Sequence, residues 1–333
     1  MLDLVLVWDL TIHKFILTFE EGQNFPIMRK IPRKALLFIF LLLQTCISIA
    51  QNRILVFQSD FGLKDGAVSA MKGVAMGVSP DLRIFDLTHE IPAYNIWEAA
   101  YRLQQTVPYW PAGTVFVSVV DPGVGTERRS VVLKTKTGQF IVTPDNGTLT
   151  LIAASLGIAE IRQIDEAVNR RKDSEKSYTF HGRDVYAYTG ARLAAGVISF
   201  DQVGPLPDKQ EVVSLPYQPA AIEGKTIHGT IAILDVQYGN IWTNITGDLF
   251  QQLGVHFGDK LHVMLYHKMQ LVYQGDMPYC ATFGAVAIGK PLAYLNSLLQ
   301  LSFALNQGSF AERYKIGSGN EWRVEVRKLK VKS

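Results

Sequence analysis

After the first fifty residues, short apolar runs alternate with segments of helical periodicity. Arg53–Gln58 and Val115–Val120 are mostly apolar runs, which favours buried strands, and Val68–Val78 has small and apolar residues at helical spacing. The same pattern predicts a strand over Leu82–Asp86 and a helix over Ile96–Thr106. Because alternating strands and helices are typical of parallel sheets, the pattern predicts an α/β fold with a largely parallel sheet over residues 51–204.

The pattern changes beyond residue 204. Residues 205–225 carry four prolines among mixed charges, which favours a linker. Beyond it, apolar runs follow one another without long helical segments between them, so a second, mainly β domain is predicted over residues 226–333. Its predicted strands are Thr226–Asp235, Lys260–Tyr266, Leu292–Asn296, Leu301–Leu305 and Trp322–Val326.

Residues 1–50 fit neither domain. Met28–Lys34 is short and basic, the uncharged apolar run Ala35–Ala50 follows it, and Ser48 and Ala50 are the small residues that signal peptidase reads. This order predicts a signal peptide over about residues 28–50, with Met28 as the start, and an exported, periplasmic or secreted protein. The alternative is an uncleaved membrane anchor, although the run is shorter than the roughly 18–20 residues of a spanning helix. Once the segment is removed, no stable membrane span is expected.

Composition narrows the possible functions. The chain of 333 residues is 48% hydrophobic and 19% charged, which is typical of a globular protein. The 33 basic and 30 acidic residues give a net charge of +3, too little for a nucleic-acid-binding face, so no nucleic-acid partner is expected. Cys46 and Cys280 fit neither a disulfide framework nor a zinc motif. Dinucleotide-binding, P-loop, zinc-protease and nucleophile-elbow patterns are also missing from the sequence, which leaves an enzyme of another kind or a small-ligand binder.

Two polar loops follow predicted strands, at the sheet edge where ligands bind in such folds. Ser59–Gly62 follows the first strand, and Asp121–Arg129 follows the third and puts a carboxylate close to two guanidinium groups. The second loop indicates either an Asp–Arg pair that faces a pocket or a tight turn with solvated arginines.

His181 lies just before a helical stretch predicted over Val185–Ala195. A histidine in this place is either a general base that works near neutral pH or a cap of the helix N-terminus. In the second domain, Asp235, Tyr238 and Asn240 follow a predicted strand. An acid, an aromatic ring and an amide can bind a polar planar ligand, or they can simply form a turn.

Eight short motifs occur in a fixed order along the chain. They are Ser59–Gly62, Met71–Val74, Asp86–His89, Asp121–Arg129, Pro144–Gly147, Phe180–Asp184, Asp235–Asn240 and Leu295–Ser297. In this order they resemble the S-adenosylmethionine hydroxide adenosyltransferase family, to which fluorinating and chlorinating enzymes are related. The resemblance runs from about Arg53 to Val326. It implies an N-terminal α/β sandwich domain, a C-terminal β-barrel-like domain, and a homotrimer with each site between the N-terminal domain of one subunit and the C-terminal domain of its neighbour.

The resemblance also implies the site residues. The family's water-handling Asp–Arg–His triad falls on Asp121, Arg128 and His181. The substrate-binding positions fall on the ribose-diol carboxylate Asp60, the aromatic residues Tyr94 and Phe180, the methionine-binding Asp235 and Ser297, and the adenine-lining Tyr238, Asn240 and Phe283.

The implied activity is hydrolysis of S-adenosylmethionine. Water or hydroxide attacks C5′ and gives adenosine and L-methionine, with no cofactor and no metal. One alternative is a halogenase that uses the same substrate. The resemblance disfavours it, because the inserted loop of those enzymes would fall between Leu133 and Phe140, where only a hairpin is predicted. The other alternative is an exported protein that binds an adenosyl ligand without turnover.

Overall fold

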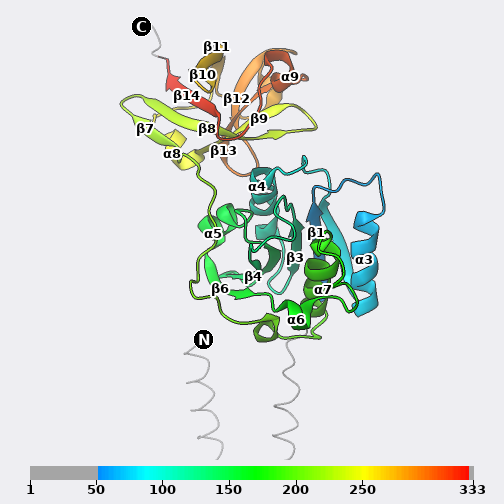
Figure 1. Ribbon diagram of the computed structural model, residues 1–333. Helices are drawn as coiled ribbons and strands as arrows, with labels where there is room; N and C mark the ends of the chain where they lie inside the picture. Colours follow the sequence, from blue (N-terminus) through cyan, green and yellow to red (C-terminus); the bar gives the residue numbers. More distant parts are fainter. Residues whose placement is uncertain (1–51, 330–333) are drawn as a thin grey trace, which may run out of the picture. The chain divides into compact units, whose positions relative to one another are not determined.

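The computed structural model describes residues 52–329, and these fold around two β-sheets (Figure 1). The predicted signal peptide and the start at Met28 lie outside the described residues. Within residues 52–329, no helix combines the length and the apolar character that crossing a membrane requires.

The first sheet has six strands in the order β2-β1-β3-β5-β4-β6. The pairs β2–β1, β1–β3 and β3–β5 are parallel, whereas β4 pairs antiparallel with both β5 and β6. The prediction of a largely parallel sheet is therefore confirmed. The strands are β1 Ile54–Ser59, β2 Arg83–Thr88, β3 Val115–Val119, β4 Ser130–Thr135, β5 Phe140–Pro144 and β6 Ile158–Gln163.

Helices cover both faces of this sheet. Alternate residues of a strand point to opposite faces, so Leu55 and Phe57 of β1 share a core cluster with two helices, while Ile54 and Val56 share another cluster with two others. The first two helices are α3 Ala67–Val78 and α7 Tyr188–Ala194, and the second two are α4 Ile96–Thr106 and α5 Thr150–Leu156. The shorter helical segments are η2 Val107–Tyr109, α6 Glu166–Asn169, η3 Gly182–Ala187 and η4 Phe200–Val203.

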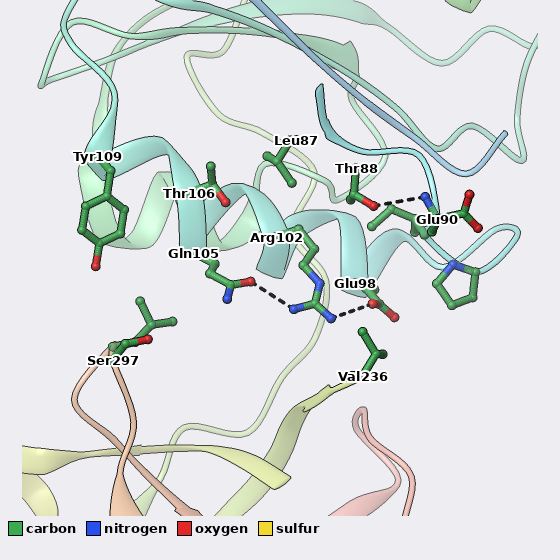
Figure 2. A pocket seen from close by; sticks show the side chains of 13 residues that line it. Leu87, Thr88, Glu90, Glu98, Arg102, Gln105, Thr106, Tyr109, Val236 and Ser297 are labelled. Atoms are coloured by element: carbon green, nitrogen blue, oxygen red, sulfur yellow. Dashed lines mark hydrogen bonds and ion pairs between the residues drawn. The ribbon is translucent and has the colours of Figure 1, made fainter. Parts of the chain in front are cut away.

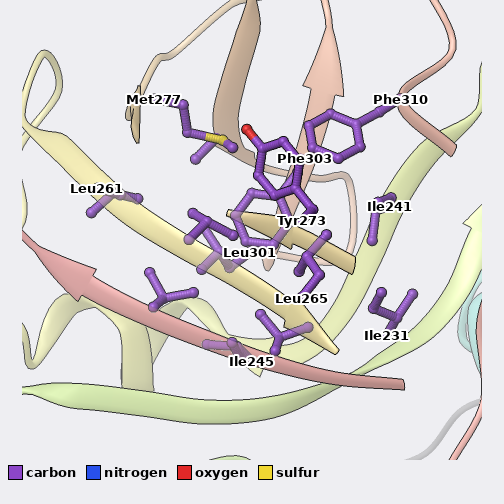
Figure 3. Close-up of a cluster of buried hydrophobic side chains, with 14 of the residues drawn as sticks. Ile231, Ile241, Ile245, Leu261, Leu265, Tyr273, Met277, Leu301, Phe303 and Phe310 are labelled. Carbon is purple, nitrogen blue, oxygen red and sulfur yellow. The ribbon is translucent and has the colours of Figure 1, made fainter. Parts of the chain in front are cut away.

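The second sheet has eight strands, and every ladder between its named strands is antiparallel. Its path runs from β11 to β12, and a bridge between Tyr279 and Ala293 brings these two ends together. The sheet is therefore nearly closed, as the barrel-like prediction requires, around the apolar side chains shown in Figure 3. Its elements are β7 Ala221–Glu223, β8 Thr226–Asp235, β9 Asn240–Thr246, α8 Gly247–Gln251, β10 Lys260–His267, β11 Gln270–Pro278, η5 Phe283–Ala285, β12 Pro291–Leu295, β13 Gln300–Leu305, α9 Phe310–Tyr314 and β14 Trp322–Lys328. Strand β7 lies inside the segment predicted as a linker.

Helix α4 connects the two sheets through side-chain hydrogen bonds. Trp97 donates its indole N–H to the carbonyl oxygen of Ala232 at 2.7 Å, and the Tyr101 hydroxyl donates to Oε1 of Gln300 at 2.7 Å. Burial raises the pKa of Tyr101, so this hydroxyl stays protonated and remains a donor. The C-terminal part of β8, which ends at Asp235, is thus hydrogen-bonded directly to α4, one of the helices that cover the first sheet.

Candidate active site

Asp121 and Arg128 form a buried ion pair in the loop between β3 and β4. Nε of Arg128 donates to Oδ1 of Asp121 at 2.8 Å, and Nη2 of Arg128 donates to Oδ2. The Asp121 and Arg128 side chains are 5% and 11% exposed, so the interpretation of a turn with solvated arginines is wrong for Arg128. Burial is the largest single influence on Arg128 and would lower its pKa, but the hydrogen bond with Asp121 and the electrostatic interactions with Asp121, Tyr186 and Glu166 together outweigh burial and raise the pKa. The guanidinium is therefore permanently charged.

His181 is buried and immediately precedes η3, a π-helical turn. Its side chain makes no capping hydrogen bond, so the interpretation as a helix cap is wrong. The helical stretch predicted from Val185 begins earlier, at Gly182, and changes to α-helix at Tyr188. A Cβ on Gly182 would lie 3.1 Å from the Phe61 ring, so glycine allows the His181 segment to approach the loop that follows β1.

Two guanidinium groups flank the imidazole of His181. Nδ1 lies 3.3 Å from Nη2 of Arg128, and Nε2 lies 3.0 Å from Nη2 of Arg170. Arg170 is itself paired with Glu166, one helical turn before it in sequence. Burial lowers the pKa of His181, the two arginines lower it further, and Glu166 and Asp121 oppose them. The imidazole is therefore neutral near pH 7.

Ser130 closes these side chains into a ring. Nη1 of Arg128 donates to Oγ of Ser130 at 3.1 Å, and that hydroxyl donates to Oε1 of Glu166 at 3.4 Å. The three triad residues that the resemblance implied are thus brought together in space. Arg170, Glu166 and Ser130 complete the group and were not predicted from the sequence.

A second polar chain holds the loop that carries Asp60. Oγ of Ser59 lies 2.7 Å from Nδ1 of His89, and Nε2 of His89 lies 3.1 Å from Oδ1 of Asp86. Lys72 binds the other oxygen of Asp86 at 2.6 Å. Burial opposes the charge on Asp86, yet the hydrogen bonds from Lys72 and His89 lower its pKa, so it is a carboxylate. The sequence motifs contained Lys72, Asp86 and His89, but no role was assigned to them.

Asp60 accepts a hydrogen bond from the backbone N–H of Tyr94 at 2.9 Å. Tyr94 has φ +68°, which is rare for an aromatic residue, and the residue is 72% exposed. Phe180 lies beside this loop, with its ring centroid 5.7 Å from that of Phe61. Asp60 and Tyr94, in the loops that follow β1 and β2, therefore belong to one group of loops with Phe180, which precedes η3.

Four further candidates line one pocket of about 760 Å³ in the second sheet's loops. These are Asp235, Tyr238, Asn240 and Phe283. Nδ2 of Asn240 donates to Oδ2 of Asp235 at 3.1 Å, while residues Tyr238 and Phe283 are 67% and 41% exposed. The lining contains residues 234–312 only, and none of the candidates from the first sheet.

Ser297 lines a different pocket, of about 650 Å³, between α4 and the second sheet's loops. Figure 2 shows Arg102 bound to Glu98 and Gln105 on one wall, with Ser297 and Val236 on the other. Val236 also lines the 760 Å³ pocket. The structure therefore does not place Ser297 with the other candidates of its domain.

A metal centre was not predicted from the sequence, and the described part of the chain offers no cluster of three or more His, Cys, Asp or Glu side chains that could hold a metal ion.

Models of one protein family match both parts of the chain. The model of the SAM hydroxide adenosyltransferase N-terminal domain matches residues 55–204, and that of the C-terminal domain matches residues 229–323. The chain belongs to the SAM hydroxide adenosyltransferase family. The matched regions contain every candidate residue of both groups.

Individual relatives agree with this family assignment. The chain is 35% identical over 269 residues to the (R)-S-adenosyl-L-methionine hydrolase of Salinispora tropica, covering 80% of this chain and 96% of that protein. It is 30% identical over 297 residues to the fluorinase of Actinopolyspora mzabensis, covering 81% and 96%. The crystal structure of an uncharacterized conserved protein from Thermotoga maritima superposes with a TM-score of 0.74 at 35% identity, covering 82% of this chain and 99% of that one. The relatives of this chain therefore include proteins named for hydrolysis and for fluorination.

Proposed function

We propose that this chain hydrolyses S-adenosyl-L-methionine to adenosine and L-methionine. The oxygen of water or hydroxide attacks C5′ of the ribose, and the C5′–S bond breaks as the C5′–O bond forms. Sulfur keeps the electron pair and leaves as the neutral thioether of methionine, and one proton of the water is released. The observation that carries this proposal is the buried group of Asp121, Arg128 and His181 in a member of this family.

This group suits activation of water. Water is hardly ionised at neutral pH, so stabilising hydroxide is the demanding part of the reaction. The charged Arg128 supplies N–H donors in a partly desolvated place, where such donors act more strongly than in bulk water. Asp121 and His181 are the proton acceptors in contact with Arg128. The thioether leaves without protonation, so we expect activity without a metal or another cofactor.

The remaining candidates suit the rest of the substrate. We assign the ribose hydroxyls to Asp60, and the space beside the adenosyl group to Tyr94 and Phe180. In the 760 Å³ pocket, the rings of Tyr238 and Phe283 and the Asn240 amide suit adenine, and Asp235 suits the methionine ammonium. Ser297 is assigned to the methionine carboxylate from the 650 Å³ pocket, which shares Val236 with the 760 Å³ pocket that Asp235 lines.

Turnover of S-adenosylmethionine tests the proposal. Purified protein in buffer with a chelator should convert the substrate to adenosine and methionine, and ¹⁸O-labelled water should place the label on O5′ of adenosine. The His181→Ala variant is the matched control for contaminating activity. Chloride or fluoride is added in a parallel reaction, and formation of a 5′-halogenated nucleoside would favour the halogenase. Calorimetric binding without product would favour the binding protein.

We also propose that the protein is a homotrimer with sites shared between subunits. The proposal is supported by the lining of the 760 Å³ pocket, which lacks the residues of the first sheet, and by the exposed rings of Tyr94 and Tyr238. If each site takes one group of residues from each of two subunits, mixing His181→Ala with Asp235→Ala protein under conditions of subunit exchange should restore activity. A fully active monomer in light scattering would contradict the proposal.

Finally, we propose that the protein is exported. The proposal is supported by the order of basic, apolar and small residues over positions 28–50. N-terminal sequencing of the native protein should find Gln51 as the first residue. An N-terminus at Met1 or Met28 would favour a retained segment.

A further inference from the structure

We infer that Arg170, held by Glu166, is a positioning residue that fixes His181 as a hydrogen-bond donor through Nδ1. This inference rests on the proposed function, because it assigns a role to His181 in binding the attacking oxygen. It concerns the state of one imidazole ring, which can be measured without any turnover.

The contacts of His181 cannot all be hydrogen bonds. A neutral imidazole has one N–H donor and one nitrogen lone pair, whereas a guanidinium nitrogen only donates. Arg170 lies 3.0 Å from Nε2 and Arg128 lies 3.3 Å from Nδ1, so only one of them can find a lone pair. The shorter contact assigns the lone pair to Nε2, and the proton is then on Nδ1.

The position of Arg170 is fixed from several sides. Its side chain is 9% exposed and is paired with Glu166. Its guanidinium carbon lies 5.0 Å from the centre of the Tyr178 ring, which itself meets the His181 ring edge to face at 6.2 Å. Ser130 connects Glu166 back to Arg128. Arg170 therefore contacts Nε2 of His181 as part of a packed group of side chains and not as a mobile surface side chain.

Stability alone does not account for this arrangement. Nη1 of Arg170 is buried and has no hydrogen-bond partner among the described residues. A buried donor without a partner is a net cost to folding, and such groups in native proteins usually have a functional reason. Here the buried guanidinium brings its other terminal nitrogen to His181.

The consequence is a pair of donors that face one another. With the proton on Nδ1, the N–H of His181 and the Nη2–H of Arg128 converge, and an oxygen that accepts from both relieves their conflict. Hydroxide is such an acceptor, and two fixed donors stabilise it as an oxyanion hole stabilises a developing oxyanion. The lone pair of Nε2 is engaged by Arg170, so the proton of the water passes to the carboxylate of Asp121.

NMR of the intact protein tests the tautomer. Protein labelled with ¹⁵N in its seven histidines is observed near neutral pH, and the His181 signals are assigned by their loss in His181→Asn. We expect a protonated-type nitrogen at Nδ1 and an unprotonated-type nitrogen at Nε2. In Arg170→Met, the proton should move to Nε2. Arg162→Met is the matched control, because Arg162 is also a largely buried arginine paired with acids, Glu160 and Asp201, and none of its ion pairs joins it to His181.

Two substitutions of His181 test the role of the donor. The side-chain amide nitrogen of Asn lies at the same number of bonds from Cα as Nδ1 of His. The side-chain amide nitrogen of Gln lies at the same number of bonds from Cα as Nε2 of His. His181→Asn should therefore keep kcat within about tenfold of the wild type. His181→Gln should lose about 10²–10³-fold, as for loss of an oxyanion donor. Arg170→Met should lower kcat by about 10–100-fold, the range typical for loss of the partner that orients a functional histidine, with KM unchanged.

The outcomes separate the two proposals. A proton on Nε2 in the wild type, or an Arg170→Met variant that loses activity with its tautomer unchanged, would overturn the positioning role. Greater activity in His181→Gln than in His181→Asn would do the same. The expected tautomers in a protein that does not turn over S-adenosylmethionine would leave the positioning of His181 standing and overturn the proposed function.

Discussion

His89 and His181 are equally buried, at 4% exposure each, and have opposite surroundings. His89 lies between the hydroxyl of Ser59 and the carboxylate of Asp86. The Asp86 carboxylate accepts a hydrogen bond from Nε2–H of His89, the Ser59 hydroxyl donates to Nδ1, and the Ser59 oxygen accepts from the backbone N–H of Phe61. His181 instead lies between the donors Arg128 and Arg170.

The difference between the two histidines indicates how the protein uses each one. Every donor and acceptor of the His89 ring has a partner of the right kind, which is typical of a histidine that holds a loop in place. One N–H of the His181 ring faces a guanidinium, which is also a donor. A further acceptor is therefore needed to complete the hydrogen bonds of the His181 ring. An incompletely satisfied buried group in a candidate site is the stronger sign of chemistry.

The largest expected effect is on kcat in His181→Ala. Loss of a donor to the attacking oxygen should lower kcat by about 10²–10³-fold. Affinity for S-adenosylmethionine, measured by calorimetry, should stay within a few-fold, because the attacking oxygen is not part of this ligand. If affinity fell while the single-turnover rate stayed normal, His181 would be a binding residue and the contrast with His89 would be lost.

Substitution of Asp60 should weaken substrate binding more than it lowers the rate, which is the opposite of the effect expected for His181. In Asp60→Ala, the ribose hydroxyls lose a charge-assisted hydrogen bond worth about 1.5–3 kcal/mol, so affinity should fall by about 10–150-fold. The bond changes little as C5′ reacts, so KM rises more than kcat falls. The control ligand is 2′,3′-dideoxyadenosine, which lacks the ribose hydroxyls. If Asp60→Ala lowered the affinity for this ligand and for adenosine equally, Asp60 would not contact the ribose hydroxyls.

His89→Ala should lower the free energy of unfolding more than it lowers kcat. The change leaves the buried Ser59 hydroxyl without its partner and removes one partner of Asp86, which should cost about 1–3 kcal/mol of unfolding free energy in urea titrations. The Asp60 loop loosens with it, so KM should rise while kcat changes little. If His89→Ala lowered kcat as much as His181→Ala does, His89 would also act in the reaction, and the contrast between the two histidines would be wrong.

The smallest effect is on the pH dependence of stability. Burial lowers the pKa of both histidines below the ordinary 6.5. Below pH 6.5 the unfolded chain therefore takes up protons that the folded chain still excludes, and stability falls as the pH falls, by at most about 1.4 kcal/mol per pH unit for each histidine. His181→Asn and His89→Gln should each reduce this slope in urea titrations between pH 7 and 5. Unchanged slopes would place the proton uptake elsewhere.

The sequence predicts regular elements well where the apolar pattern is uninterrupted. Helix Ile96–Thr106 and strand Thr226–Asp235 have the predicted ends, and Val115–Val119 is one residue shorter than predicted. Strands β9 and β11 were missed, because Thr243 and Asn244 interrupt the apolar residues of NIWTNIT and QLVYQGDMP contains Gly275 and Asp276 near its end. Such strands depend on pairing with neighbours more than on their own composition.

The ring around His181 was only partly predictable. Arg128 and His181 are 53 positions apart, and their meeting was implied by the family resemblance and not by periodicity. Glu166 and Arg170 begin a stretch dense in charges, which in sequence resembles a solvated surface. Only the packing of Arg170 against Tyr178 and His181 shows that one of these charges is buried.

Helix α4 also bears on how freely the two parts of this chain could be exchanged between relatives. Trp97 and Tyr101 bind Ala232 and Gln300, which lie on the other sheet. A recombinant that joins residues 52–225 of this chain to the C-terminal part of a relative keeps the donors and replaces both acceptor segments. Trp97 binds a backbone carbonyl, so its hydrogen bond does not depend on the side chain at position 232, whereas the hydrogen bond of Tyr101 depends on the residue at position 300. Functional chimeras should therefore carry glutamine, or another acceptor of equal reach, at that one position.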